Sequence, residues 1–116
     1  TIYCPTNGTC GVHCNGNNSC NMVHIFGGQR PEYSSNLTVN CLNYSSALRI
    51  HAEYATAIDF QCHDTNCNGI SVTANHAKTL LVGCGNAGST NTVCKYWSIH
   101  GNYITGPVAI WCEGER

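Results

Sequence analysis

The chain has 116 residues, its formal net charge is −1, and only 9% of its residues are charged. This length predicts a single domain over residues 1–116. Five Lys and Arg residues cannot form the basic stripe of a nucleic-acid-binding protein, so we expect no nucleic-acid partner. No apolar run approaches the roughly 20 residues that a membrane-spanning helix needs.

The cysteine and asparagine content indicates secretion. Ten cysteines in so short a chain predict a disulfide framework formed in an oxidising, extracellular compartment. Four N-x-Ser/Thr sequons, the acceptor sequence for N-glycosylation, begin at Asn7, Asn17, Asn36 and Asn43. The chain has no initiator Met and no signal-peptide pattern, so we expect it to be processed or to be a piece of something longer.

One pattern recurs five times: an apolar residue, any residue, an apolar residue, any residue, and then cysteine. In chain order the copies are residues 10–14, 37–41, 58–62, 80–84 and 108–112. Alternation with a period of two predicts half-buried strands whose cysteine lies on the inward face.

Two further sides follow these strands. A second strand is predicted at residues 23–25, 48–50, 70–72 and 97–99, and a shorter third side at residues 53–55, 75–77 and 102–104. On the third side the residues predicted to point inward are Ala55, Ala77 and Ile104. Those predicted to point outward are Tyr54, His76 and Tyr103.

Three short sides in about 21 residues predict an all-β fold, a parallel β-helix of about five coils. In such a solenoid Val39, Phe60 and Val82 should lie in adjoining layers of one interior column. The alternative is an antiparallel β-sandwich of short strands, which has similar turn spacing. The sandwich does not explain why cysteine closes the same strand in every copy.

Pairs of cysteines bracket the corners. The spacing predicts four local disulfides, which are Cys4–Cys10, Cys14–Cys20, Cys62–Cys67 and Cys84–Cys94. Cys41 and Cys112 remain. Three coils would separate them, beyond the reach of a disulfide, so rearranged pairing and bonds to another copy both stay open.

A zinc site is the competing interpretation of the cysteines. It would use Cys14, Cys20, Cys62 and Cys67 with His13 and His63. No Cys-x-x-Cys knuckle occurs, and the spacings are not those of zinc modules, so we expect no metal and no other cofactor. His51, Thr73 and His100 should align on the outward side of the second strands, and two coils between the histidines exclude one shared ion.

The two ends of the chain match each other. If one copy ran into another, the segment from Ile2 to Cys4 would fall where a second strand is expected after Cys112. Neither terminus shows an obvious capping helix or a charged, Pro-rich cover. We therefore expect head-to-tail stacking of copies, or one period of a tandem array, and such contacts build filaments because they do not close.

A family resemblance supports this expectation. Residues 12–20, Val-His-Cys-Asn-Gly-Asn-Asn-Ser-Cys, resemble the cysteine-rich right-handed β-helix repeats of large secreted protist proteins. The repeat pattern of most of the chain is also similar to the repeat units of glycan-coated extracellular fibrils. The resemblance implies a right-handed helix and a structural role with N-glycans sheathing a fibre. The chain departs from it in lacking a second cysteine after Cys41 and in its unequal coil lengths.

Carbohydrate binding is the alternative function. Tyr54, His76 and Tyr103 would form an outward ladder at the coil spacing, which suits stacking against sugars. Cleavage would need paired carboxylates or a base beside calcium-binding acids. The acidic residues form no tight motif; they are Glu32, Glu53, Asp59, Asp64, Glu113 and Glu115. We therefore expect no enzymatic activity and no catalytic residue.

Overall fold

The computed structural model describes residues 1–14, 21–32, 34–41, 45–62, 67–84 and 97–112. These ranges form strands and turns, with no helix among them. The strands are β1 (Ile2–Tyr3), β2 (Asn7–Cys14), β3 (His24–Phe26), β4 (Ser34–Cys41), β5 (Ser45–Ser46), β6 (Arg49–His51), β7 (Ala57–Cys62), β8 (Cys67–Asn68), β9 (Ser71–Thr73), β10 (Thr79–Cys84), β11 (Ser98–His100) and β12 (Val108–Cys112).

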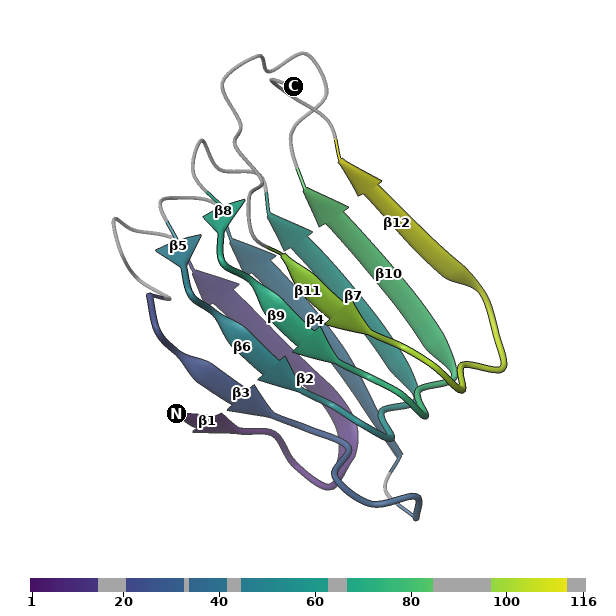
Figure 1. Cartoon of the computed structure of the whole chain (residues 1–116). Coiled ribbons are helices and arrows are strands. Elements are labelled where there is room, and N and C mark those ends of the chain that lie inside the picture. The colour runs from purple at the N-terminus through teal and green to yellow at the C-terminus, as the bar shows by residue number, and fades with distance from the viewer. Residues whose placement is uncertain (15–20, 33, 42–44, 63–66, 85–96, 113–116) are drawn as a thin grey trace.

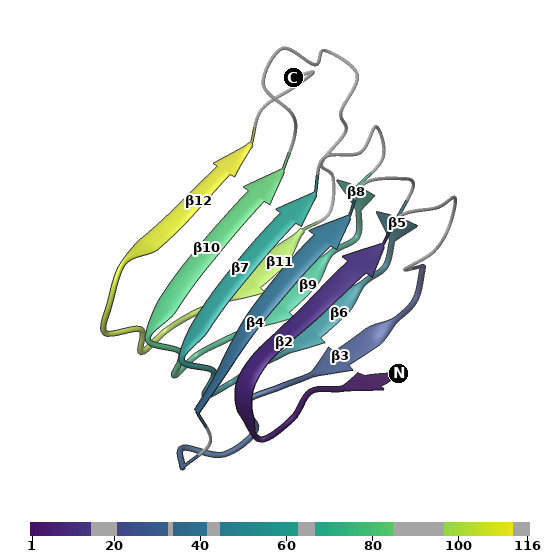
Figure 2. The same ribbon diagram turned by 180° about the vertical axis from the view of Figure 1, so that it is seen from behind.

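Two parallel sheets face each other across the core. The long-strand sheet has the order β12-β10-β7-β4-β2, and the short-strand sheet has the order β1-β3-β6-β9-β11. The chain runs along one sheet, crosses over, returns along the other and advances by one strand each time (Figure 1). The opposite view shows the same advance and establishes a right-handed helix (Figure 2).

These observations confirm the predicted right-handed parallel β-helix. Each main sheet has five strands within the described ranges, in agreement with about five coils. Each pairing between the described strands is parallel, which excludes the antiparallel sandwich.

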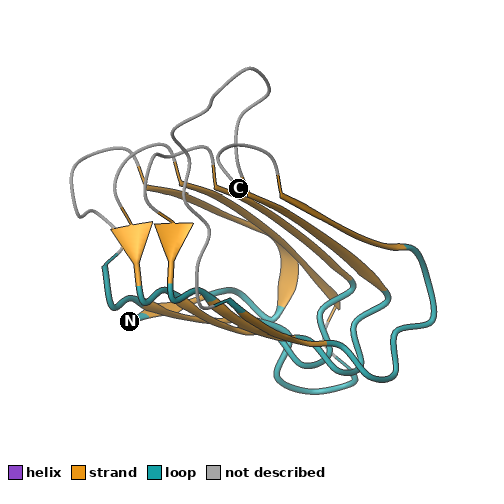
Figure 3. Ribbon diagram, turned by 45° about the horizontal axis from the view of Figure 1, so that its top comes forward, coloured by secondary structure: helices purple, strands orange, loops and turns teal. Residues whose placement is uncertain are grey.

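The strands pair in matching register, so equivalent residues of successive coils form columns. Val39 pairs with Phe60 and Phe60 with Val82, as the sequence predicts. All three side chains are completely buried. The short-strand sheet supplies the opposing column, which includes Ile25 and Ile50. The core thus consists of stacked apolar rows between two layers. Figure 3 shows the two layers of strands.

The third side differs in part from the prediction. Residues 53–55, 75–77 and 102–104 lie in turns rather than strands, and a small third sheet, β5-β8, forms instead between the two main sheets at another corner (Figure 3). The inward residues Ala55 and Ala77 are buried as expected, whereas Ile104 is only partly buried. A turn can stack like a strand because its backbone groups still bond to the coil below.

Five cysteines occupy equivalent ladder positions, and the four for which burial is described, Cys14, Cys41, Cys62 and Cys84, are buried. Ladder pairing joins Cys14 to Cys41, Cys41 to Cys62, Cys62 to Cys84, and Cys84 to Cys112. This column places Cys41 and Cys112 three coils apart, as the repeat predicts. Cys41 is completely buried.

The first predicted disulfide, Cys4–Cys10, is present, with 5.5 Å between its Cα atoms. Cys14, Cys62 and Cys84 are also disulfide-bonded. The partners predicted for them, Cys20, Cys67 and Cys94, have side chains outside the described part of the structure.

Candidate functional site

An aromatic column runs along the turns of the third side. Tyr54 stacks on His76 and His76 stacks on Tyr103, with 4.9 Å between ring centroids in both pairs and interplanar angles of 10° and 7°. Backbone hydrogen bonds set this alignment, because the N–H groups of His76 and Tyr103 donate to the carbonyl oxygens of Glu53 and Asn75. The alignment that the sequence predicts for these three residues is confirmed.

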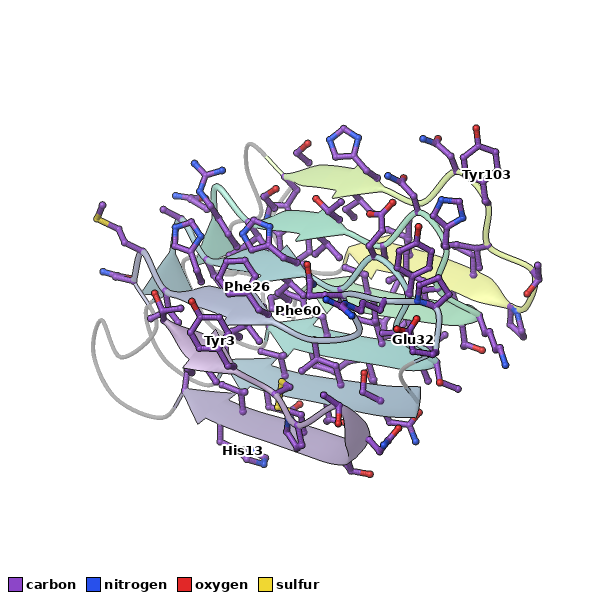
Figure 4. All side chains as sticks on the ribbon, turned by 90° about the horizontal axis from the view of Figure 1, so that it is seen from below. Tyr3, His13, Phe26, Glu32, Phe60 and Tyr103 are labelled. Atoms are coloured by element: carbon purple, nitrogen blue, oxygen red, sulfur yellow. A yellow bond between two sulfur atoms is a disulfide. The ribbon has the colours of Figure 1, made fainter. Side chains whose placement is uncertain are left out.

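The stacking geometry determines what the column offers to a ligand. Within the column the ring faces contact one another, so mainly ring edges point to solvent. The exception is Tyr103, the last ring of the column, which lies at one end of the solenoid (Figure 4) and is 66% exposed. Each stacked pair contributes about 0.5–1.5 kcal/mol beyond area burial. The column therefore ties successive coils together.

A polar column accompanies the rings, one position earlier in each turn. The Asn75 side-chain amide donates to Glu53 Oε2 at 3.4 Å, and the backbone N–H of Asn102 donates to Asn75 Oδ1 at 3.2 Å. His76 Nε2 lies 3.9 Å from Glu53 Oε1. Sequence reasoning did not single out these amide contacts, although the shared turn position before each ring was visible in the repeat.

A shallow pocket lies between this turn and the short-strand sheet. It has a volume of about 100 Å³ and is lined by Gln29, His51, Ala52, Glu53 and Thr73. The side-chain amide of Gln29 donates to the carbonyl oxygens of Gly27 and His51. Ligand pockets usually have about 300–1,000 Å³. This pocket is smaller, and Gln29 already bonds to the backbone around it.

A second ring column lies on the outward side of the short-strand sheet. Tyr3 stacks on Phe26 with 5.3 Å between centroids, and Phe26 stacks on His51 with 4.5 Å (Figure 4). His51 also contacts His24, with 3.1 Å between Nε2 and Nδ1. Burial, and then the nearby charges of His24 and Arg49, lower the pKa of His51 below its ordinary value.

The predicted alignment of His51, Thr73 and His100 is confirmed by the ladder register. Thr73 stands between the two histidines. Among the described residues, no group of three or more His, Cys, Asp or Glu side chains is arranged to hold a metal ion.

Two of the four sequons lie on described strands. Asn7 begins β2 and Asn36 lies on β4, and both are exposed. They alternate with the inward residues Cys10 and Leu37, so they face outward from the long-strand sheet. Asn17 and Asn43 lie outside the described residues.

The far end of the solenoid exposes core positions. On β12, Val108 and Ile110 stand in register with Leu80 and Val82, which are buried. Val108 and Ile110 are nevertheless 51% and 55% exposed, because β12 is the last strand of its sheet. Trp111 lies on the other face of β12, against Gly83.

The near end is formed by β1 and β2, which are the first strands of the two sheets. No charged residue occurs in the strands of either end, β1, β2, β11 or β12. In the described part of the chain the charged side chains belong to the segments between them; they are Arg30, Glu32, Arg49, Glu53, Asp59 and Lys78. Soluble β-proteins commonly protect open sheet edges with charge, especially Lys. Within the described residues, the end strands themselves lack this protection.

The described segments include no helix that is long and apolar enough to span a membrane. Comparison of the chain with protein-family models, with characterised proteins and with solved structures finds no match.

Proposed function

We propose that this chain is a structural unit of an extracellular, N-glycosylated filament in which β-helical units stack end to end. The observation that carries the proposal is the exposure of Val108 and Ile110, two residues whose columns are buried in every preceding coil with which they align. A further coil on β12 would cover them. The partner that supplies such a coil is the near end of another copy.

The chemistry of the ends supports the same partner. An open parallel edge offers backbone N–H and C=O groups to a new strand, and charge on that edge would oppose pairing. β2 and β12 have neither Lys nor any other charged residue. Contact between two different ends of one molecule is heterologous and does not close, so it propagates as a filament.

The disulfides and sequons support an extracellular setting. Disulfides persist in oxidising compartments, and Cys4–Cys10 joins β2 to the segment that follows β1. Asn7 and Asn36 are accessible and face sideways from the long-strand sheet. Glycans at these positions would surround a filament without covering its ends.

Sedimentation and electron microscopy of the full chain test the proposal. We expect concentration-dependent linear filaments, with an axial spacing of about 4.8 Å between strands. Ala109→Lys places a charge on the outward side of the open strand β12 and should abolish assembly. Thr38→Lys is the matched control, because Thr38 occupies the same outward column in an internal coil and should leave assembly intact.

Two results would overturn the filament proposal: a wild-type chain that stays monomeric at every concentration, or equal loss of assembly in the two lysine variants. Intact mass measurement of native material tests the glycans. Unmodified asparagine at both Asn7 and Asn36 would contradict the proposal that N-glycans surround the filament.

A further inference from the structure

We infer that the joint between copies has a single register, in which β1 pairs with β11 and β2 pairs with β12 of the preceding copy. This inference rests on the stacking proposed above and specifies which residues meet. It places Tyr3 of one copy on His100 of the preceding copy and Gly11 on Ala109 of the preceding copy. The evidence is the position, chemistry and backbone pattern of the four end strands.

The two ends present the same pair of edges. At the near end the short-strand sheet ends in β1 and the long-strand sheet ends in β2; at the far end they end in β11 and β12. Each internal step of the helix pairs short strand with short strand and long strand with long strand, all parallel. Joining the two ends repeats this step in both sheets at once.

The inward columns continue across such a joint. Ile2 stands at the start of the column that ends in Ile99, since the ladder runs from Ile2 through Ile25 to Ile99. In the long-strand sheet the column that begins at Val12 ends in Ile110. The columns therefore meet apolar to apolar; Val12 is only 8% exposed in the single copy, so the surface that the joint covers in this column is mainly that of Ile110, which is 55% exposed.

The outward ring column continues as well. Tyr3 uses one face to stack on Phe26, and its other side is at the open end (Figure 4). Tyr3 and His100 are the first and last residues of the same outward column. The joint therefore adds the imidazole of His100 to the Tyr3–Phe26–His51 stack. The new contact is a ring stack like the one between Phe26 and His51.

The backbone of β12 is open to a new strand along its exposed side. In a parallel sheet, successive residues direct their N–H and C=O groups to alternate neighbours. Leu80 donates to the carbonyl oxygen of Pro107, so Pro107 and Ala109 face β10 while Val108 and Ile110 face the open edge. The missing N–H of Pro107 therefore does not interrupt this edge.

The length of β1 restricts slippage. A shift of two residues along β12 would keep inward residues inward, because the side-chain period is two. The same rigid shift would move β1 along β11. Since β1 has only two residues and β11 has three, that shift removes most of their pairing. One register satisfies both sheets together.

Pairs of charged substitutions can test the register directly. Gly11 and Ala109 belong to one outward column, and a Cβ atom at Gly11 would meet nothing within 4 Å. In the inferred joint Gly11 lies opposite Ala109 of the neighbouring copy. At low ionic strength G11D/A109K should restore the assembly that A109K loses, whereas G11K/A109K should remain defective.

The slipped joint has its own diagnostic pair, H13D/A109K, because a two-residue shift would bring His13 opposite Ala109. We expect G11D/A109K to assemble at a critical concentration about threefold or more below that of H13D/A109K at low salt. The reverse order, or no rescue by G11D, would overturn the register while wild-type filaments still supported stacking. Absence of wild-type filaments would overturn the stacking itself.

Discussion

Val82 and Ile110 occupy one interior column in neighbouring coils, yet Val82 is completely buried and Ile110 is more than half exposed. The two residues have the same orientation on their strands. Val82 has a coil on each side, whereas Ile110 lies on the last strand of the sheet; Val12, on the first strand, is only 8% exposed, so the open face of this column lies at the Ile110 end. The column therefore shows both the internal packing of the solenoid and an apolar surface at its far end.

Truncation of this column should separate stability from assembly. Phe60→Ala removes a completely buried ring with a coil on each side, and we expect the free energy of unfolding to fall by about 3–5 kcal/mol. Ile110→Ala should change the stability of the monomer much less but should weaken filament formation. Denaturant unfolding below the assembly concentration, followed by sedimentation, measures the two effects. Equal loss of stability in both variants would contradict this assignment.

Tyr3 and Met22 form a matched pair for testing the near end, because each is 77% exposed. Tyr3 lies on the edge strand β1, whereas Met22 lies outside the described strands. Tyr3→Ala should weaken assembly because it removes the first ring of the outward column, and Met22→Ala should not. Sedimentation at a fixed concentration compares them. Equal assembly by the two variants would show that Tyr3 does not contribute to the joint.

Stability should decrease in acid partly through His51. Its folded-state pKa lies below the ordinary value of 6.5, so protonation favours the unfolded chain. The contribution of neutral His51 is therefore complete above the unfolded pKa of about 6.5 and is lost progressively as the pH falls below it. His24 and Arg49 add positive charge beside the ring.

Urea unfolding between roughly pH 5 and pH 8, the range in which histidine titrates, measures this dependence. His51→Asn should flatten the decline of stability below about pH 6.5. His100→Asn is the control, because His100 occupies the same outward column at the end of the sheet. A decline in His51→Asn as steep as in the wild type would show that His51 does not cause it.

We expect that only glycine fits at position 83 without strain, because the indole ring of Trp111 lies directly against it. A Cβ atom at Gly83 would lie 2.5 Å from two carbon atoms of the indole ring and 2.6 Å from Gln61 Oε1. Gly83→Ala should therefore displace Trp111 and lower stability by about 1–3 kcal/mol. Tryptophan fluorescence and denaturant unfolding follow the two changes. In a Trp111→Ala background the same substitution should cost less, and an unchanged cost would assign the effect to Gln61 alone.

The solenoid and its columns can be predicted from the pattern of residues along the chain. Alternation with a period of two identifies the inward residues, and cysteine at the end of five repeats identifies which strands are equivalent. The stacked register of Val39, Phe60 and Val82, the alignment of Tyr54 with His76 and Tyr103, and the Cys4–Cys10 bridge were all predictable for this reason.

How side chains within a column meet depends on three-dimensional packing and cannot be predicted from the repeat. A repeat specifies that Tyr54 and His76 share a stripe, but ring rotation and turn geometry determine that their faces contact each other. The contact between His24 and His51 crosses two columns, and the approach of Trp111 to Gly83 depends on the side-chain conformer. Likewise, the exposure of Ile110 depends on which strand lies last in the sheet, which alternation along one strand does not encode.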